Sequence, residues 1–438
     1  MTHDRRTPPL GGWVRVGLVL GVVLAVAVPV VIAARGAVGP GIRSLAVAGP
    51  LPSALALDDI HHRLVVLDQS GGVSLLDTRS SSLAHVVPPG AWRPAFGMSQ
   101  GAALAVDPSA GRAVVALSSQ SQQSATAPPG AARVIDTVTG RVVATPRVGV
   151  GDMAVAIAPA TGRAFVANLY EQTVSVLSTR DGRALGTVAV AGQPTTLGVD
   201  GPGGVVAVGG NSFGATLDAR TGHGRSSQAL NSLDVMVVDA RRHRALAYSE
   251  SGQLSALDMR TGALVGQTIL GQPGVMAGDD DAATGKIFFA ARVWSSTQGR
   301  ALLVDARTGR PTRSVTLPGV PSAFAADPRT GDMLALLSII RPRRPDPWGW
   351  LPAPIRRLLP FQTPPAGVSV TSTIAVLDGR DGRLKRSIDL PADGAVAVSM
   401  ALDARAGRLY VARTWAWSLA ARNRAPQDGD VLVLDAPA

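Results

Sequence analysis

The sequence contains no cysteine among its 438 residues. A chain without cysteine has no disulfide framework, no thiolate metal site and no lipoprotein attachment site. If such a chain is exported, its apolar core alone must hold the fold. A closed array of several hundred residues can bury enough surface to do this.

Lysine and glutamate are nearly absent, since lysine occurs only at Lys286 and Lys385 and glutamate only at Glu171 and Glu250. The formal net charge of +11 is therefore carried by arginine. A bias toward arginine, alanine and glycine is typical of a GC-rich genome, so basicity alone is weak support for a nucleic-acid partner. Because the chain also carries an export signal, described below, we expect no nucleic-acid partner.

Motifs of known catalytic or cofactor chemistry are missing as well. The sequence has no Gly-x-Ser-x-Gly elbow, no phosphate-binding glycine-rich loop, no haem-attachment motif and no regular tryptophan motif of a quinone-binding propeller. The histidines have no convincing metal-ligand spacing. Although a Ser-His-Asp triad assembles in space, nothing in the sequence indicates one. We expect no metal and no cofactor.

One long apolar run lies near the N-terminus. Uncharged residues extend from Val16 to Ala34, and a helix of this length spans about 28 Å, close to the thickness of a bilayer core. The arginines around this run are distributed asymmetrically: three precede it and one follows it at once, namely Arg5, Arg6, Arg15 and Arg35. The positive-inside rule therefore predicts a cytoplasmic N-terminus and an exported remainder.

The same segment also has features of a cleaved signal peptide. Val31-Ile32-Ala33 resembles a small-residue cleavage site, and Pro29 can end the apolar helix just before it. We therefore expect a single-pass membrane protein with an extracytoplasmic C-terminal domain, and a secreted protein is the alternative.

The remaining chain is a repeat of about 40 residues. Each unit has four short apolar runs rich in valine, leucine and alanine, separated by glycine, proline, aspartate and threonine. This pattern predicts strands joined by tight turns, and no sustained helical period occurs after residue 42. Four strands at this period are typical of one propeller blade. We label these strands a, b, c and d from the centre outward.

The number of units predicts the number of blades. Copies begin near Pro52, Gly101, Asp152, Thr195, Leu233, Gly274, Ser322 and Ala395. The last copy ends after strand c at Leu434-Asp435, and its missing strand d is supplied by Arg43–Ala48, which is similar to the d strand Gly186–Ala191. We expect an all-β, eight-bladed propeller closed by its N-terminal strand. Seven blades is the alternative, if the degenerate fourth copy is absorbed elsewhere.

The third copy resembles a known repeat. Ala164–Pro194 is similar to the repeat of YVTN-type β-propellers, with Phe165-Val166-Ala167-Asn168 in the name-giving position and Gly192-Gln193-Pro194 as the closing turn. Gly271-Gln272-Pro273 repeats this closing turn, and the likeness is looser in the other copies. The resemblance implies a bacterial or archaeal cell-surface or periplasmic propeller. We divide the chain into a cytoplasmic N-terminus (1–12), an anchor or signal peptide (13–34), a linker (35–42) and a propeller (43–438).

Aspartates recur at two places in the repeat, and we interpret them as turn residues. An aspartate side chain can accept backbone N–H groups two or three residues further on and so fix a turn. Only the third copy departs from both series. The residues after strand a are Asp58, Asp107, Asp200, Asp239, Asp281, Asp327 and Asp403, and those after strand c are Asp77, Asp136, Asp218, Asp258, Asp305, Asp378 and Asp435.

Other aspartates break the pattern. Asp279 and Asp280 fall within strand a of copy six, where other copies carry alanine, valine or leucine, and one of them must point toward the central channel. Such a carboxylate can bind a cation, and a solvated channel wall is the alternative. Asp152, Asp234 and Asp393 lie at d-to-a connections, where they can ring the mouth of the same channel.

Insertions form the clearest departure from the repeat. The b-to-c loops and the d-to-a connections share one face, the top. They are long only in copies that are consecutive around the ring, at 118–130, 294–299, 341–365, 413–429 and, from copy one to copy two, 88–101. These loops hold every tryptophan except Trp13, namely Trp92, Trp294, Trp348, Trp350, Trp415 and Trp417. The copy-seven insertion also carries Arg341, Arg343, Arg344, Arg356 and Arg357 against Asp346 alone.

Tryptophan and arginine together predict a recognition surface, because indole rings stack on sugars or apolar groups and guanidinium pairs with carboxylate or phosphate. The alternatives are a lid over the top face and a membrane contact. The sequence thus favours a non-catalytic envelope module that binds a protein or an anionic glycan. The alternative function is an enzyme, a hydrolase, a lyase or a metal-dependent one, with its site at the top mouth of the channel.

Overall fold

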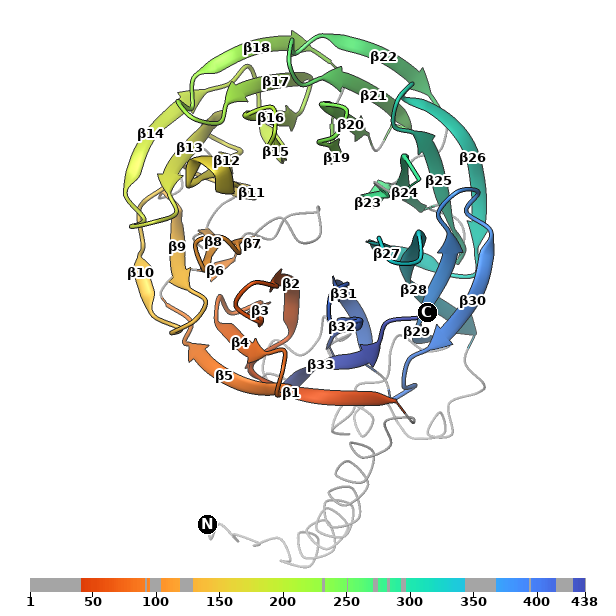
Figure 1. Cartoon of the computed structure of the whole chain (residues 1–438). Helices are drawn as coiled ribbons and strands as arrows, with labels where there is room; N and C mark the ends of the chain where they lie inside the picture. The colour runs from red at the N-terminus through yellow and green to blue at the C-terminus, as the bar shows by residue number, and fades with distance from the viewer. Residues whose placement is uncertain are drawn as a thin grey trace, which may run out of the picture.

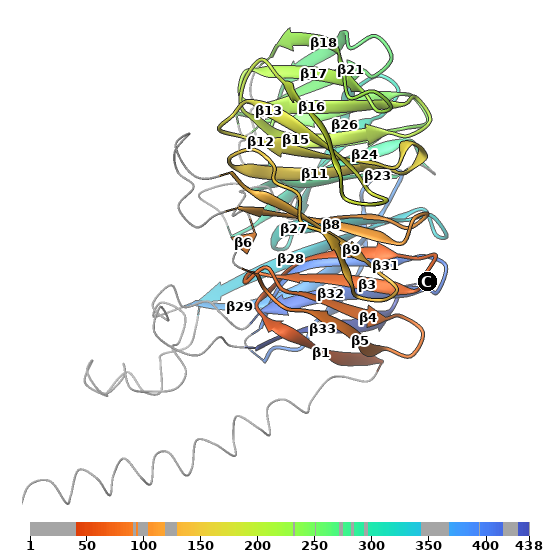
Figure 2. The ribbon, with the colours of Figure 1, turned by 90° about the vertical axis from the view of Figure 1, so that its left-hand side faces the viewer.

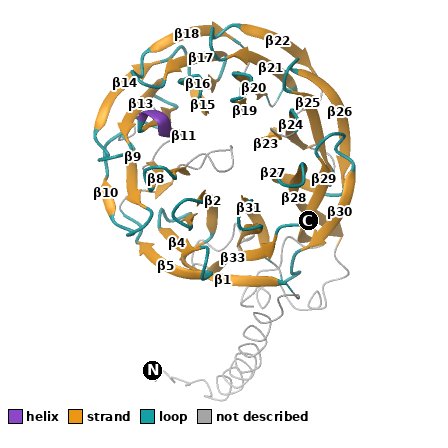
Figure 3. Ribbon diagram, in the orientation of Figure 1, coloured by secondary structure: helices purple, strands orange, loops and turns teal. Residues whose placement is uncertain are grey.

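In the computed structural model, eight antiparallel sheets form a closed ring (Figure 1). The structure describes residues 41–90, 93–94, 104–118, 129–230, 233–249, 251–270, 275–281, 284–292, 297–342, 368–393, 395–414 and 428–437. The predicted all-β, eight-bladed propeller is confirmed, and the seven-bladed alternative is wrong. Within these ranges the one helical element is a single 3₁₀ turn, η1 (Pro159–Thr161), and no helix has the length and hydropathy of a membrane span (Figure 3).

Each blade runs from strand a at the centre to strand d at the rim. Blades 1 to 3 contain β2 (Pro52–Asp58), β3 (Arg63–Asp68), β4 (Val73–Asp77) and β5 (Ser82–Val87); β6 (Arg93–Pro94), β7 (Leu104–Asp107), β8 (Arg112–Ser118), β9 (Ala131–Asp136) and β10 (Val142–Ala144); and β11 (Asp152–Ala158), β12 (Arg163–Asn168), β13 (Thr173–Ser178) and β14 (Ala184–Ala189). Blades 4 and 5 contain β15 (Pro194–Asp200), β16 (Val205–Gly210), β17 (Phe213–Asp218) and β18 (Gly224–Ala229); and β19 (Val235–Asp239), β20 (Arg244–Tyr248), β21 (Gln253–Asp258) and β22 (Leu264–Ile269).

Blades 6 to 8 complete the ring. They contain β23 (Val275–Asp281), β24 (Lys286–Arg292), β25 (Gly299–Asp305) and β26 (Arg310–Leu317); β27 (Val320–Asp327), β28 (Asp332–Pro342), β29 (Val368–Asp378) and β30 (Leu384–Asp389); and β31 (Val396–Asp403), β32 (Arg408–Thr414), β33 (Asp428–Asp435) and β1 (Ile42–Pro50).

The ring closes through its first strand, as the sequence predicts. β1 pairs antiparallel with β33, with Leu45 opposite Val431, and so supplies strand d of blade 8. The amide of Ala48 also donates to Ser74 Oγ of blade 1 at 3.0 Å. The closing strand therefore contacts the blades on both sides of the seam.

The core lies between blades. Because alternate side chains of a strand face opposite sides of its sheet, strands b and c pack against both neighbouring blades. At the seam, Leu64 and Val66 of blade 1 pack with Tyr410 and Val431 of blade 8. Interfaces of this kind repeat around the ring, so stability is a sum of nearest-neighbour contacts.

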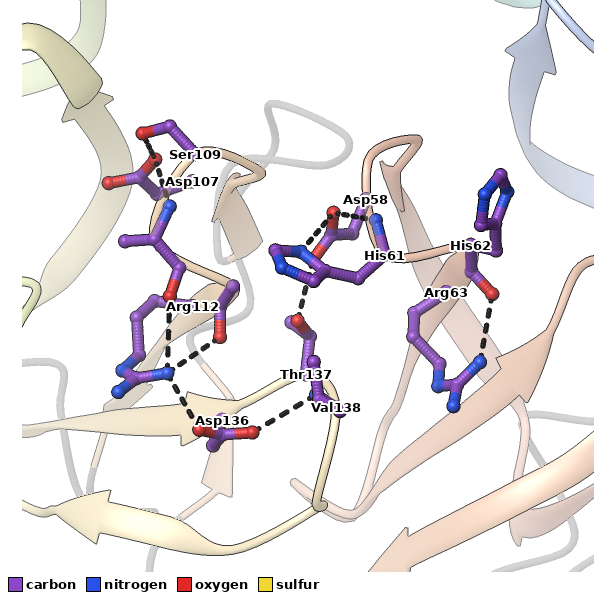
Figure 4. A network of polar contacts seen from close by, with 12 residues as sticks. Asp58, His61, His62, Arg63, Asp107, Ser109, Arg112, Asp136, Thr137 and Val138 are labelled. Atoms are coloured by element: carbon purple, nitrogen blue, oxygen red, sulfur yellow. Dashed lines mark hydrogen bonds and ion pairs between the residues drawn. The ribbon is translucent and has the colours of Figure 1, made fainter.

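The turn role of the aspartates is confirmed for thirteen of the fourteen, because each accepts at least one backbone N–H of its own turn. Only Asp435 has no such bond within the described residues, and it is exposed. The carboxylates that follow strand a also join blades. Thr137 Oγ1 of blade 2 donates to Asp58 Oδ2 of blade 1 at 2.5 Å, and His61 Nδ1 lies 3.1 Å from both Asp58 oxygens (Figure 4).

Strand a of blade 2 departs from the prediction. β6 pairs with the last two residues of β8, and β7 pairs with the first four, Arg112–Val115. Strand a of blade 2 is therefore described as two pieces, β6 and β7, which pair with the same strand. The expectation that 88–101 is simply a d-to-a connection is wrong, because a two-residue strand is defined by its partner and leaves no local pattern.

Candidate binding face and channel carboxylates

The antiparallel order gives the ring two different faces. The a-to-b and c-to-d turns lie on one, which we call the turn face, and the b-to-c connections lie on the other, which we call the insertion face. The longer connections follow β8, β24, β28 and β32, in blades 2, 6, 7 and 8. Strand contacts place blades 7, 8, 1 and 2 in succession. The roots of the insertions therefore form one arc on the insertion face.

A long hairpin dominates this arc. β28 and β29 have 11 residues each, five more than β16 of blade 4, which corresponds to about 17 Å of extra strand. Pairing continues through Ile339–Thr371 to Pro342–Val368. Figure 2 shows the hairpin reaching past the other blades. The predicted loop 341–365 is thus corrected at its start, because Arg341 lies within β28, where it is exposed.

The other residues of the predicted recognition surface lie outside the described residues, and their role stays a prediction. They are Trp92, Trp294, Arg343, Arg344, Trp348, Trp350, Arg356, Arg357, Trp415 and Trp417.

Asp279 of β23 connects two blades. Its Oδ2 accepts the amide of Ala326 on β27 of blade 7 at 2.9 Å, and its Oδ1 accepts the amide of Asp280 at 2.9 Å. Burial raises the pKa of Asp279 to about 6, although both hydrogen bonds oppose this effect. This carboxylate is therefore occupied by backbone donors.

Asp280 is in a different situation. Burial raises its pKa to about 7, with contributions from the carboxylates of Asp239 and Asp279, against the opposing effect of Arg242. Its Oδ1 is buried and has no hydrogen-bond partner in the described part of the chain. Arg242 is itself engaged, since its Nη1 lies 2.6 Å from Asp239 Oδ2. The sequence did not suggest this group, because Asp239 and Arg242 belong to a turn of blade 5.

Two of the remaining predicted carboxylates lie away from this pair. Asp393 pairs with Arg413 of blade 8, and Asp234 precedes β19 at the end opposite to Asp239. Asp152 opens β11 of blade 3, and its side chain lies outside the described part. Among the described side chains no three His, Asp or Glu residues are grouped so that they could hold a metal ion.

A second buried charge cluster was not visible in the sequence. Arg413 is 2% exposed, and its Nε and Nη2 donate to the two oxygens of Asp430 at 2.9 and 2.8 Å. Its Nη1 donates to Asp393 at 3.0 Å, and Ser44 of the closing strand donates to Asp430 Oδ2 at 2.5 Å. This cluster joins three strands of blade 8. Ser44 and Asp430 are 386 positions apart, so no local pattern reveals it.

Comparison with known proteins supports the fold. No protein-family profile matches the chain, and no curated protein does. Among solved structures, the computationally designed Ika8 protein is similar over 89% of this chain and 98% of its own, with 14% identity and a TM-score of 0.57. BamB from Moraxella catarrhalis is similar over 90% of this chain and 98% of its own, with 15% identity and a TM-score of 0.52.

The chain is a β-propeller. At such low sequence identity, the two likenesses show the fold of this propeller alone.

Proposed function

We propose that this propeller is a non-catalytic binding or scaffold module at the cell envelope, and that it recognises its partner through the insertion face. One observation carries the proposal: the long connections are rooted on a single face of neighbouring blades. If the long connections were needed for folding, they would occur in all blades, because every blade packs against its neighbours in the same way. Concentration on one arc is typical of a surface that contacts something else.

Within this proposal the chain is a YVTN-type propeller. Asn168 supports this assignment, because it is fully buried and both the oxygen and the nitrogen of its side-chain amide form hydrogen bonds. Its Oδ1 accepts the amide of Gly149 at 3.1 Å, and its Nδ2 donates to Thr173 and Ser175 at 2.9 Å. An asparagine supplies the acceptor and the donors that these three groups need.

The partner chemistry follows from the residues of the arc. Segment 341–365 carries five arginines against one aspartate, and the arc holds six tryptophans. This composition fits an envelope protein or an anionic glycan. The first strand begins on the turn face, so a membrane anchor at residues 13–34 would leave the insertion face pointing away from the bilayer.

The described core of blade 7 is covered by the neighbouring blades. Leu336 and Ile374 are fully buried in a cluster with Leu409 of blade 8, and Leu337 is fully buried against blade 6. The apolar partners of the hairpin base therefore come from the ring itself. This arrangement favours a recognition role for residues 343–367 over a covering role.

The test is a deletion that the register makes possible. Because Pro342 pairs directly with Val368, residues 343–367 can be replaced by Asn-Gly, which forms a two-residue hairpin turn. We expect the thermal midpoint to stay within about 2 °C of the parent, since every described core residue of blade 7 is kept. The variant should no longer recover its partner from envelope extract. The matched control replaces 343–367 by a Gly/Ser segment of equal length.

Two results would count against the proposal. Undiminished recovery of the partner would exclude the hairpin tip from recognition. A midpoint loss of more than about 5 °C would indicate a lid instead.

A further inference from the structure

The turn face carries a regular series of arginines. In five consecutive blades, 3 to 7, the c-to-d turn places an arginine at the same position, two residues after the end of strand c. These residues are Arg180, Arg220, Arg260, Arg307 and Arg380, and all five are exposed.

The turn geometry explains the exposure. In blades 4 to 7 the preceding aspartate accepts the backbone amide of this arginine, for example Asp218 Oδ1 from Arg220 at 2.9 Å and Asp258 Oδ1 from Arg260 at 3.0 Å. The backbone is thereby fixed while the side chain extends into solvent. Within the described residues none of the five guanidinium groups makes a hydrogen bond or an ion pair.

Blades 1 and 2 differ at these turns. The position of the exposed arginine is taken by Val138 in blade 2 and by Arg79 in blade 1, whose Nη2 lies 2.6 Å from His62 Nε2. At this turn position, the arginines without a described side-chain partner are therefore those of blades 3 to 7.

The charge balance of this arc is positive. Its five c-to-d turns (179–183, 219–223, 259–263, 306–309 and 379–383) contain seven arginines and two aspartates. The aspartates that end strand c in blades 4 to 7 each accept a backbone amide of the turn. The exposed residues of these turns therefore carry a net positive charge.

The turn face is also level. All a-to-b turns have four residues, and the c-to-d turns have four or five residues, so no described turn stands above the others. The long β28–β29 hairpin extends on the opposite side of the ring (Figure 2). A level face of this kind can approach a planar partner with all its turns at once.

The chain enters the ring on the same face. Ile42 pairs with Leu434, near the end of β33, so the preceding residues leave from the turn face at blade 8. Only residues 35–41 separate this point from the apolar run Val16–Ala34. Seven residues span at most about 25 Å. An inserted segment would therefore hold blade 8 close to the bilayer.

We propose that the turn face of blades 3 to 7 docks on an anionic membrane surface, with the five arginines contacting lipid phosphates. Guanidinium groups bind phosphate oxygens in bidentate fashion. Each basic residue near an anionic bilayer strengthens binding by about fivefold. The anchor fixes one side of the ring and the arginines fix the other, so the ring lies flat and presents its insertion face outward. The inference rests on the proposed membrane tether for its geometry.

The test uses the full chain in nanodiscs, and the absence of cysteine makes any introduced thiol unique. Ala184→Cys places a dye on β14 beside the turn face, and Ser251→Cys places one on the insertion face of blade 5. Energy transfer to a headgroup-labelled lipid reports the distance to the bilayer. Discs contain phosphatidylcholine alone or with about 30% phosphatidylglycerol, a level that gives an appreciable surface potential.

In the anionic discs we expect strong transfer from residue 184 and weak transfer from residue 251. Replacing all five arginines by glutamine should lower the ratio of docked to lifted rings by about 100-fold or more, and 0.5 M salt should act in the same direction. The control replaces the same five residues by lysine, which keeps the charge and should keep the docking. Folding is checked by the thermal midpoint, which should change little because the five exposed guanidinium groups make no hydrogen bond or ion pair within the described residues.

Transfer from residue 184 that is equal in neutral and anionic discs, or unchanged in the glutamine variant, would overturn the inference. So would binding to a soluble polyanion without binding to anionic vesicles. Failure of the tether has its own signature, because the chain would then not co-elute with neutral discs in high salt. In that event, arginine-dependent binding of the free chain to anionic vesicles still decides the inference.

Discussion

The buried cluster at the ring seam gives the sharpest prediction for stability. Asp430→Asn removes the carboxylate that holds Arg413 through two hydrogen bonds and leaves a cation that is 2% exposed with Asp393 as its only carboxylate partner among the described residues. Removing one partner of a buried ion pair costs about 3–5 kcal/mol. At about 2.1 cal/mol/K per residue, a ring of roughly 390 residues loses about 4–6 °C in its thermal midpoint.

The measurement is urea and thermal unfolding of the parent and the variant, with a matched surface pair as control. Arg405 and Asp59 also join blades 8 and 1, at 3.2 Å, but the Arg405 side chain is 76% exposed. Asp59→Asn should therefore cost less than about 1 kcal/mol. The double variant Arg413→Met with Asp430→Leu should recover most of the loss, since it removes both charges of the buried pair. If Asp430→Asn costs no more than Asp59→Asn, the cluster does not stabilise the seam.

Two further predictions concern contacts between blades. The raised pKa of Asp280, about 7, means that the folded state keeps this proton while the unfolded state releases it near pH 4, so stability falls as pH rises from about 4 to 7. Asp280→Asn removes this dependence. Between pH 4 and pH 8, the free energy of unfolding in urea should rise by about 2–4 kcal/mol in the variant relative to the parent. A difference that does not change with pH would refute the burial argument. Thr137→Val removes the hydrogen bond to Asp58 and should lower the free energy of unfolding by about 1.5–3 kcal/mol. Thr139→Val, in the exposed part of the same turn, should lower it by less than about 0.5 kcal/mol. Equal losses would contradict a stabilising role for this bond between blades 1 and 2.

The sequence predicted the ring well because the information is local and repeated. Turn aspartates, glycines and short apolar runs define each blade, and the likeness of Arg43–Ala48 to a d strand predicted the closure that β1 makes. Asp58 and Asp107 were correctly assigned to turns. Their second role, as acceptors from the next blade, needs the ring and does not follow from spacing.

The candidate sites were less predictable, because they depend on which blades meet. β6 owes its existence to pairing with Ser118 and Leu117, and nothing in its two residues indicates a strand. The perturbation of Asp280 arises from Asp239 and burial, both supplied by the fold. Asp393 was expected at the channel mouth, whereas its partner is Arg413. The insertions were found from the sequence because they interrupt a repeat.

The central claim is that recognition takes place on the insertion face, and site-specific photo-crosslinking in cells tests it most directly. A photoreactive residue at Arg341, at the base of the long hairpin, is compared with one at Ser212, in the short b-to-c turn of blade 4 on the same face. We predict a defined adduct from position 341 that is absent from position 212. Equal adducts at both positions, or an adduct at 212 alone, would contradict the account.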